Sequence, residues 1–272
     1  MTANRITSGN TQIYLSIVIP VKDEEANIEQ LAGEVSAALS TLDMGWECIW
    51  VDDGSQDGTL SVLRTLHQSD PRHMFIALER NHGQSTALAA GFRRSRGSII
   101  ATLDGDGQND PADLPALIAR LEAEDADMVN GVRRKRRDSF VRRISSRIAN
   151  GFRNLLTREN VSDVGCSLRV MRKECLEGIP LFEGMHRFLP TLIGMMGWRI
   201  TEVPVNHRPR VRGKTKYGIN NRLWVGLLDT FAVCWMRGRI IRHREVKEVV
   251  SSTTPAKDVC GVVYKAHMRG VE

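Results

Sequence analysis

The 272-residue sequence has few cysteines, and their arrangement argues against disulfides and against a cysteine-bound metal. The five cysteines lie at positions 48, 166, 175, 234 and 260. No two of them form a Cys-x-x-Cys pair, and their spacing matches no zinc site. We therefore expect reduced thiols in a cytosolic protein. The first residues contain no apolar segment of signal-peptide length, so we do not expect export.

Long apolar runs are also absent from the sequence. The longest stretch with almost no charge, residues 223–236, has 14 residues and includes Asp229. A helix that spans a bilayer needs about 20 predominantly apolar residues. We therefore expect no segment to cross a membrane. The hydrophobic content of 42% is ordinary for a folded protein with a large core.

Acids are scarce in the second half of the chain, and bases are scarce in the first. Residues 1–130 contain 9 Lys or Arg and 20 Asp or Glu (−11), whereas residues 131–272 contain 29 and 12 (+17), which together give +6. Residues 133–158 hold ten basic residues and one acid, and residues 207–222 hold no acid. The acidic half can hold a metal ion. The basic half can meet anionic lipid, phosphate or nucleic acid, so charge alone does not choose the partner.

Short apolar runs alternate with amphipathic segments over the first 131 residues. We predict strands over 15–21, 47–51, 74–78, 98–103 and 127–131, and helices over 25–42, 58–68, 85–95 and from Pro111. This alternation predicts an α/β fold with a mostly parallel sheet and helices on both faces. A further helix and strand are predicted within residues 186–205. Residues 250–272 lose periodicity, and we expect a poorly ordered tail there.

The strongest chemical signal follows the strand predicted at 98–103. Asp104 and Asp106 are two residues apart, so both carboxylates can point to one side of an extended chain. Such oxygens suit Mg²⁺ or Mn²⁺, particularly where a phosphate supplies the remaining ligands. A solvated acidic turn would be the better interpretation of one such pair alone. However, Asp52 and Asp53 follow an earlier strand in the same way, which predicts a nucleotide site at the carboxyl edge of the sheet.

Six motifs lie in a fixed order along residues 14–240. They are Pro20-Val-Lys-Asp-Glu24, Val51-Asp-Asp-Gly-Ser55, Asn81-His-Gly-Gln84 through Gly91, Asp104-Gly-Asp106-x-Gln108, Asp163-Val-Gly-Cys-Ser-Leu-Arg169, and His207-Arg-Pro-Arg210 through Gly213-Lys-Thr-Lys-Tyr-Gly218. In type and order they resemble the polyprenyl-phosphate branch of the inverting family-two glycosyltransferases, which includes dolichyl-phosphate mannosyltransferase. Lys22 departs from the aromatic residue of many relatives. The Gln-x-x-Arg-Trp signature of the processive synthases is missing, which implies transfer of one sugar per encounter.

The resemblance implies a GT-A type, Rossmann-like catalytic domain over residues 14–222, followed by a basic membrane-interface segment over 223–249. The implied reaction moves a sugar from a GDP- or UDP-linked donor to a polyprenyl phosphate, for cell-envelope glycan or glycolipid assembly. The implied catalytic residues are Asp104, Asp106 and Asp163, with Mg²⁺ or Mn²⁺ held by Asp104, Asp106 and Gln108. The implied donor-binding residues are Pro20, Glu24, Asp52, Asp53 and Gln84. The residues implied for the acceptor or the diphosphate are Arg133, Arg147, Arg169, Arg210, Lys214 and Tyr217.

Several of these residues also have a purely structural interpretation. Asp52 and Asp53 could cap the helix predicted at 58, and Glu24 and Asp163 could cap helices of their own. Most of the basic residues of 133–158 can be a solvated or lipid-facing surface. Three histidines, which lack metal-ligand spacing, are interpreted as structural: His82, His186 and His207.

Two other functions share part of the pattern. A sugar-phosphate nucleotidyltransferase would also use paired carboxylates on such a sheet. It usually carries a glycine-rich phosphate loop after the first strand, and Pro20-Val-Lys-Asp-Glu24 contains no glycine. A basic nucleic-acid-binding protein would explain the second half, but the basic stretches show no helix-turn-helix pattern and no interleaved aromatics. We therefore expect no nucleic-acid partner.

The segment after residue 222 has the pattern of a helix that lies in a membrane interface. Trp224, Leu228, Phe231 and Trp235 recur at helical spacing, and Arg222, Arg237 and Arg239 flank them. We predict that residues 223–242 lie on an anionic membrane surface, which makes the protein peripheral on the cytoplasmic face. The alternative is that these aromatics pack on the protein's own core, with a separate membrane protein providing recruitment.

Overall fold

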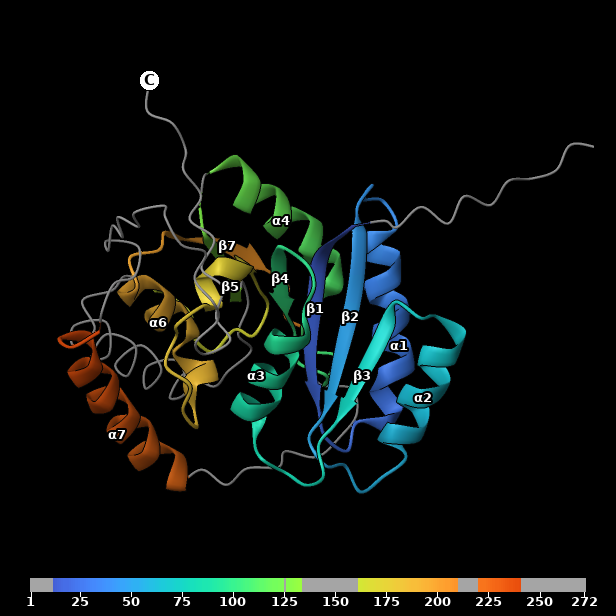
Figure 1. Ribbon diagram of the computed structural model, residues 1–272, viewed down its shortest axis with the longest axis horizontal. Helices are drawn as coiled ribbons and strands as arrows, with labels where there is room; N and C mark the ends of the chain where they lie inside the picture. Colours follow the sequence, from blue (N-terminus) through green and yellow to red (C-terminus); the bar gives the residue numbers. More distant parts are fainter. Residues whose placement is uncertain (1–11, 125, 134–160, 210–219, 241–272) are drawn as a thin grey trace, which may run out of the picture.

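The computed structural model describes residues 12–124, 126–133, 161–209 and 220–240, and gives only the backbone of 220–225 and 227. Its centre is a seven-stranded sheet with the order β3-β2-β1-β4-β6-β5-β7 (Figure 1). The strands are β1 (Ile13–Val21), β2 (Gly45–Asp52), β3 (His73–Ala77), β4 (Ile99–Thr102), β5 (Met128–Arg133), β6 (Arg169–Arg172) and β7 (Ile200–Val205). Only β6 runs antiparallel to its neighbours, β4 and β5.

Helices cover both faces of this sheet. The α-helices are α1 (Glu25–Leu39), α2 (Thr59–Ser69), α3 (Gln84–Arg94), α4 (Leu114–Ala123), α6 (Leu189–Met195) and α7 (Asn220–Arg237). Three short 3-10 helices are η1 (Pro111–Asp113), η2 (Lys173–Leu176) and η3 (Met185–Arg187). The predicted α/β sheet with two covered faces is therefore present.

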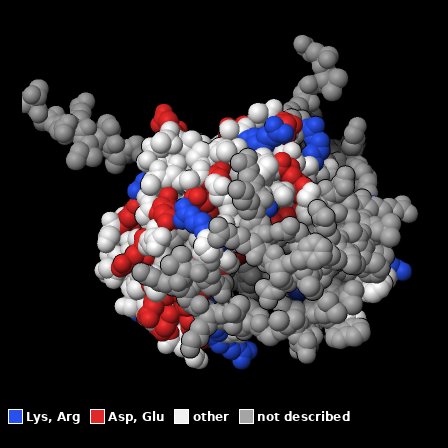
Figure 2. Space-filling model, turned by 180° about the vertical axis from the view of Figure 1, so that it is seen from behind, with Lys and Arg blue, Asp and Glu red and all other residues white. Residues whose placement is uncertain are grey.

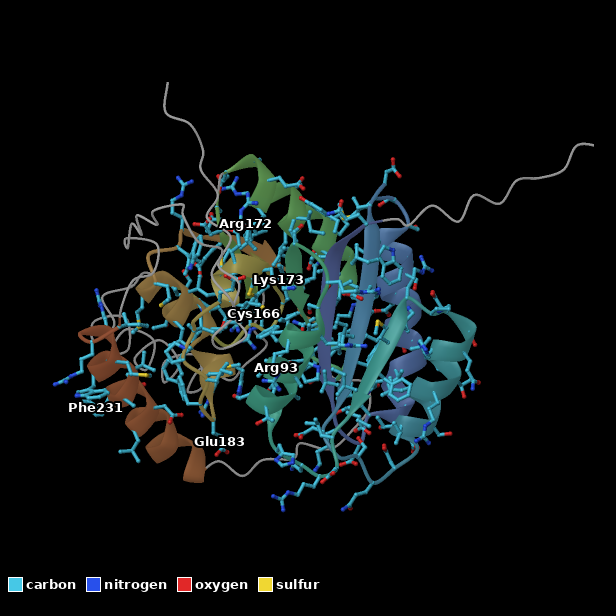
Figure 3. The ribbon with its side chains drawn as sticks, viewed as in Figure 1. Arg93, Cys166, Arg172, Lys173, Glu183 and Phe231 are labelled. Carbon is cyan, nitrogen blue, oxygen red and sulfur yellow. The ribbon has the colours of Figure 1, made fainter. Side chains whose placement is uncertain are left out.

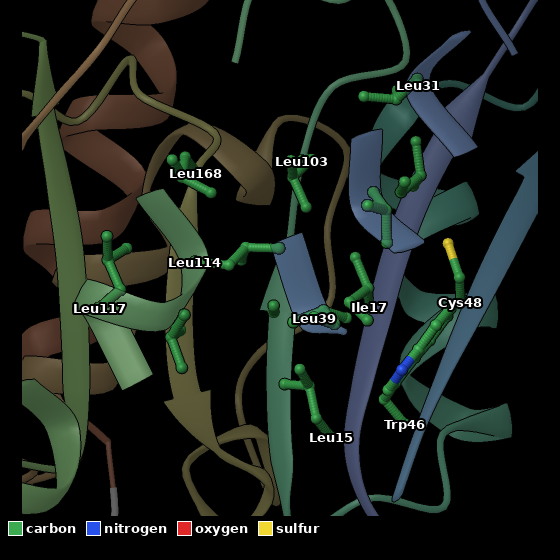
Figure 4. Close-up of a cluster of buried hydrophobic side chains, with 14 of the residues drawn as sticks. Leu15, Ile17, Leu31, Leu39, Trp46, Cys48, Leu103, Leu114, Leu117 and Leu168 are labelled. Carbon is green, nitrogen blue, oxygen red and sulfur yellow. The ribbon is translucent and has the colours of Figure 1, made fainter. Parts of the chain in front are cut away.

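Two hydrophobic clusters hold the layers together, because successive residues of a strand point to opposite faces. Leu15, Ile17 and Ile19 of β1 join a cluster with α1, α2 and α4, part of which Figure 4 shows. Val18, between them in the sequence, belongs to the other cluster, with α3 and α6. Val233 of α7 belongs to this second cluster too, so α7 packs on the domain by its inner face.

The boundaries predicted for the first nine elements agree with the structure to within about three residues. The helix predicted from Pro111 starts as the single 3-10 turn η1 and continues as α4. Strand β6 was not predicted, because its four residues, Arg-Val-Met-Arg, are too few to show an apolar alternation. Within the described ranges, no helix combines the length and apolar character that a transmembrane span requires.

The polar residues of the predicted site lie at one edge of the sheet. Parallel strands β1, β2, β4 and β5 end there, at Val21, Asp52, Thr102 and Arg133. Because β6 runs the opposite way, its first residue, Arg169, lies at this same edge. Carboxylates therefore follow the strands on one side of β4, and guanidinium groups lie on the other side. On the surface, acidic side chains gather on the side of α1 and α2 (Figure 2).

Candidate active site

The loop after β4 carries the two central carboxylates. The Gln84 side chain, at the start of α3, donates a hydrogen bond to Asp104 Oδ1 (2.8 Å). The backbone N–H of Asp104 donates to Asn109 Oδ1 (3.0 Å). Desolvation, with a smaller contribution from Asp106, raises the pKa of the Asp104 carboxyl. A divalent cation between these groups would relieve their repulsion, because it supplies the positive charge that they lack.

Glycine is required in this loop for a steric reason. A Cβ on Gly105 would lie 2.5 Å from Val21 Cγ1, so only glycine lets the loop rest on the end of β1. The backbone N–H of Gln108 donates to Asp106 Oδ1 (3.1 Å). The loop then pairs with the start of the basic segment, since Asn109 forms an antiparallel bridge with His207.

Asp52 and Asp53 are almost fully buried and shape the neighbouring loops. Asp52 Oδ1 accepts hydrogen bonds from the backbone N–H (3.0 Å) and the hydroxyl of Ser55. Asp53 accepts the backbone N–H groups of His82 (2.7 Å) and Gly83 (2.9 Å), one on each oxygen. Helix α2 begins after Gly58 without a side-chain cap, so the helix-capping alternative for the two aspartates is wrong.

The end of β1 is tied to the same loops. Pro20 pairs with Val51 in the parallel register. Glu24 is the N-cap residue of α1, but its carboxylate makes no capping bond and accepts the Asn27 side-chain amide instead (2.6 Å). Asp23 has a positive φ of 46°, and its Oδ1 accepts the backbone N–H of Gln56 (2.7 Å). The first-strand and second-strand motifs therefore form one hydrogen-bonded unit.

Arg133, the last residue of β5, forms a two-pronged ion pair with Asp163. Arg133 Nε donates to Asp163 Oδ2 and Nη2 donates to Oδ1, each at 2.7 Å. The Arg133 and Asp163 side chains are only 14% and 9% exposed. Burial lowers and the Asp163 carboxylate raises the pKa of Arg133, with a net upward shift. Residues 161–168 contain no helix, so Asp163 does not cap one.

Arg169 is buried, and its guanidinium is bonded to neutral oxygens. Nε donates to Asn130 Oδ1 (3.1 Å), Nη1 to the His186 carbonyl (2.8 Å) and Nη2 to the Val164 carbonyl (2.6 Å). Desolvation lowers the pKa of Arg169 to about 10. Such a guanidinium is a fixed positive charge at the sheet edge. It also ties β5 and the loop after Asp163 to the turn at His186.

His186, interpreted from the sequence as structural, is a neighbour of the site. Its Nδ1 lies 2.8 Å from Ser85 Oγ, in the first turn of α3 beside Gln84. The two residues are 101 positions apart, so no local pattern indicates the contact. The remaining residues implied for the acceptor or the diphosphate, Arg147, Arg210, Lys214 and Tyr217, lie outside the described residues, as does the tail over 250–272.

Helix α7 carries the predicted interface face. Leu228, Phe231 and Trp235 are 69%, 55% and 63% exposed, so these side chains do not pack on the described core. Phe231 lies on the outer side of the helix (Figure 3). The Arg239 guanidinium stacks over the Trp235 ring, 4.8 Å from its centre. The side chain of Trp224 lies outside the described part of the structure.

The model of glycosyl transferase family 2 matches residues 16–179. The chain belongs to this family. Its similarity to dodecaprenyl-phosphate galacturonate synthase of Rhizobium johnstonii is 38% identity over 225 residues, 81% of this chain and 66% of that protein. Undecaprenyl-phosphate 4-deoxy-4-formamido-L-arabinose transferase of Edwardsiella ictaluri is 36% identical over 207 residues, 76% of this chain and 63% of that protein. The chain thus spans about two thirds of the length of these relatives.

A solved structure agrees with the fold described above. Glucosyl-3-phosphoglycerate synthase from Mycobacterium tuberculosis, in complex with Mn²⁺, UDP and glucosyl-3-phosphoglycerate, superposes with a TM-score of 0.63. The match covers 84% of this chain and 81% of that one at 20% identity, which supports the fold alone. The predicted family resemblance and GT-A type fold are confirmed. The roles of individual site residues and the domain boundaries stay predictions.

Proposed function

We propose that this family 2 chain transfers a single sugar from a nucleotide-sugar to a polyprenyl phosphate, with inversion at the anomeric carbon. The observation that supports this most is the division of one sheet edge. Asp104 and Asp106 lie on the donor side of β4, and Arg133 and Arg169 lie beyond it. The named relatives are a dodecaprenyl-phosphate synthase and an undecaprenyl-phosphate transferase. A phosphate acceptor is already anionic near pH 7, so the reaction needs no strong general base.

On the donor side, we propose that Asp104, Asp106 and Gln108 hold Mg²⁺ or Mn²⁺. The described residues contain no group of three or more His, Cys, Asp or Glu that could enclose a metal. An open site of two carboxylates and an amide fits a cation whose other ligands are diphosphate oxygens. Such a cation would neutralise charge that develops on the leaving diphosphate. Gln84 orients Asp104 through its 2.8 Å hydrogen bond.

The nucleoside part of a GDP- or UDP-linked donor is proposed to lie over the loops that Asp52 and Asp53 organise. Both aspartates already accept backbone N–H groups, so they act on the base mainly by fixing these loops. Pro20 and Glu24 form the adjacent wall, at the end of β1. Recognition of the base edge by the carboxylates of Asp52 and Asp53 stays a prediction.

On the acceptor side, we propose that Arg133 binds the lipid phosphate and that Asp163 positions Arg133. The ion pair uses two of the five N–H groups of a guanidinium, so three can serve a phosphate. Asp163 Oδ1 also accepts the Gly165 N–H (3.2 Å). A carboxylate with both oxygens engaged is suited to orienting a partner. Arg147, Arg210, Lys214 and Tyr217, outside the described residues, are proposed to complete the phosphate and diphosphate contacts.

Helix α7 is proposed to rest on the anionic cytoplasmic leaflet, where the acceptor phosphate is found. Trp and Arg are the residues that membrane interfaces favour, and each Lys or Arg near an anionic leaflet contributes about 1 kcal/mol. The exposed Phe231 and Trp235 would enter the interface, and Arg239 would meet the headgroups. Recruitment by a separate membrane protein is the alternative that the vesicle experiment below tests.

The transfer itself is tested with radiolabelled UDP- and GDP-sugars, undecaprenyl phosphate and Mn²⁺ or Mg²⁺. We expect label in the lipid extract for one donor, and an anomeric configuration opposite to the donor's by NMR. Label in a free nucleotide-sugar formed from sugar phosphate would support a nucleotidyltransferase instead. Absence of lipid product with every donor would refute the proposal.

Membrane binding is tested by co-sedimentation with anionic vesicles. Phe231→Glu with Trp235→Glu should abolish vesicle binding and leave the melting temperature nearly unchanged, because both side chains are exposed. The same two charges placed on α2, by Ser61→Glu with Gln68→Glu, serve as the matched control. If the α7 variant still binds vesicles, α7 is not the contact surface. If wild type does not bind them, recruitment depends on a partner protein.

A further inference from the structure

The 3-10 turn η3 lies between α7 and the catalytic edge, which is the sheet edge that carries Asp104 and Arg133. Two adjacent residues of the turn contact different neighbours. His186 Nδ1 lies 2.8 Å from Ser85 Oγ, next to the Gln84 that bonds Asp104. Arg187 Nη2 donates to Asp229 Oδ2 of α7 at 2.9 Å. Figure 3 shows Glu183 on the loop that approaches α7 just before this turn. One short turn therefore contacts both the proposed donor site and the proposed membrane helix.

Gly184 makes this arrangement possible. Its φ is +93°, a backbone conformation that residues with a Cβ rarely adopt. A Cβ on Gly184 would lie 2.8 Å from Arg187 Nη2 and 2.8 Å from Asp229 Oδ2, in the space that the ion pair occupies. The Gly184 N–H also donates to Ser85 Oγ (3.0 Å). The glycine thus lets the turn contact α3 and α7 at the same time.

Attaching a helix through an ion pair costs free energy, because both charges lose contact with water. The Arg187 and Asp229 side chains are only 32% and 18% exposed, and Arg187 Nε is buried without a partner among the described residues. Val233, one turn further along α7, is fully buried in the second hydrophobic cluster. Apolar contact could hold α7 here equally well, because a buried ion pair adds little stability beyond an apolar replacement. What the pair adds is direction, because its 2.9 Å hydrogen bond can form only when Asp229 faces Arg187.

We propose that the Arg187–Asp229 pair is a positioning device that sets α7 relative to the catalytic edge. It rests on the proposed function, in which α7 lies on the membrane and the acceptor is a lipid phosphate. With α7 fixed in the leaflet, the pair determines the height and angle at which Arg133 meets the lipid phosphate. Arg187 and Asp229 touch no substrate. Their effect is confined to acceptors that are themselves held in a bilayer.

The test compares two acceptors in the same enzyme preparations. One is undecaprenyl phosphate in anionic vesicles, and the other is a prenyl phosphate of two isoprene units, dissolved without vesicles. The variants are Asp229→Asn, Arg187→Met, and the charge exchange Arg187→Asp with Asp229→Arg. The conservative Asp229→Asn keeps the shape of the side chain, so it remains informative if another variant fails to fold. Vesicle co-sedimentation and melting temperature are measured for each.

For the single variants, we expect kcat/KM with the vesicle acceptor to fall about tenfold, within the range for residues coupled in one ion pair. With the dissolved acceptor, kcat/KM should stay within about twofold of the wild-type value. Vesicle binding should be unchanged, because Phe231 and Trp235 remain, and the charge exchange should recover part of the lost rate. Equal losses with both acceptors, or no loss with either, would overturn the proposal. A wild-type protein inactive on both acceptors would instead refute the proposed function, before any variant is compared.

Discussion

Removing one member of the Arg133–Asp163 pair should destabilise the domain and impair the acceptor step together. The pair is two-pronged at 2.7 Å, and both side chains are at least 86% buried, since Arg133 is 14% exposed and Asp163 9%. Leaving one buried charge without its partner costs about 3–5 kcal/mol. Because each pair member keeps some solvent contact, we expect about 3 kcal/mol for Asp163→Asn. That corresponds to a decrease of about 6–12 °C in melting temperature for a domain of this size.

A double-mutant cycle separates the pair from its surroundings. Asp163→Asn, Arg133→Met and the double variant are compared by urea unfolding, which reports the free energy of unfolding directly. The double variant should be less destabilised than the sum of the single variants, by about 2–3 kcal/mol, because it leaves no unpaired charge. In activity assays at a temperature where each variant is folded, Arg133→Met should raise the KM for lipid phosphate about tenfold to a hundredfold. The KM for the nucleotide-sugar should stay near wild type.

Three results would each refute part of this reasoning. In the first, Asp163→Asn keeps wild-type stability but loses nearly all kcat, while Arg133→Met keeps its kcat. Asp163 would then act on a proton and would not merely hold Arg133. If both variants lose donor binding, the guanidinium contacts the diphosphate and the acceptor assignment is wrong. Additive stability losses in the double variant would show that the two charges are not coupled.

Three further predictions concern separate parts of the molecule. Asp106→Asn should leave the melting temperature near wild type and remove nearly all transfer, and full wild-type activity in excess EDTA would contradict the metal assignment. Glu47 is fully buried and accepts hydrogen bonds from Ser16 Oγ (2.7 Å) and Arg96 Nε (2.8 Å), whereas the Arg96 side chain is 60% exposed. Glu47→Ala should therefore lower the free energy of unfolding by about 1–3 kcal/mol, the cost of a buried polar group left without its partner, and leave the KM for either substrate unchanged. Burial lowers the pKa of His73, with Asp70 acting in the opposite direction, so stability should fall as the pH drops through the unfolded-state value of about 6.5. His73→Gln should lack that part of the slope between pH 7 and 5, and an identical slope would assign it to other groups.

The fold could be predicted from the sequence because local patterns of apolar and polar residues indicate its strands and helices. The runs at 15–21 and 47–51 are apolar on both faces, as buried parallel strands require. Asp104 and Asp106 could be placed at the sheet edge for the same reason, since they directly follow a strand. Strand β6 was missed because its four residues, two of which are the arginines at its ends, show no periodicity. Its direction also depends on its neighbours β4 and β5.

The polar contacts of the site were less predictable, for a physical reason. Asp163 was expected as a catalytic residue or a helix cap, and its pairing with Arg133 joins residues 30 positions apart. Arg169 was expected to contact phosphate, and the structure surrounds it with Asn130 and two backbone carbonyls. The contact of His186 with Ser85 likewise depends on how three loops meet. Such contacts are decided by tertiary packing, which a single sequence does not encode in any short window.

The reversal of strand direction at β6 divides the sheet into two groups of strands, each from one part of the sequence. Strands β1 to β4 come from residues 13–102, and the remaining strands come from residues 128–205. The two groups meet in the sheet where β4 pairs with β6, through four residue pairs from Ile99–Arg172 to Thr102–Arg169. Side chains also cross that junction, because Val129 and Val170 of the second group share a hydrophobic cluster with Leu15 and Ile17 of the first. A graft of residues 128–205 from a relative must therefore keep these shared core positions.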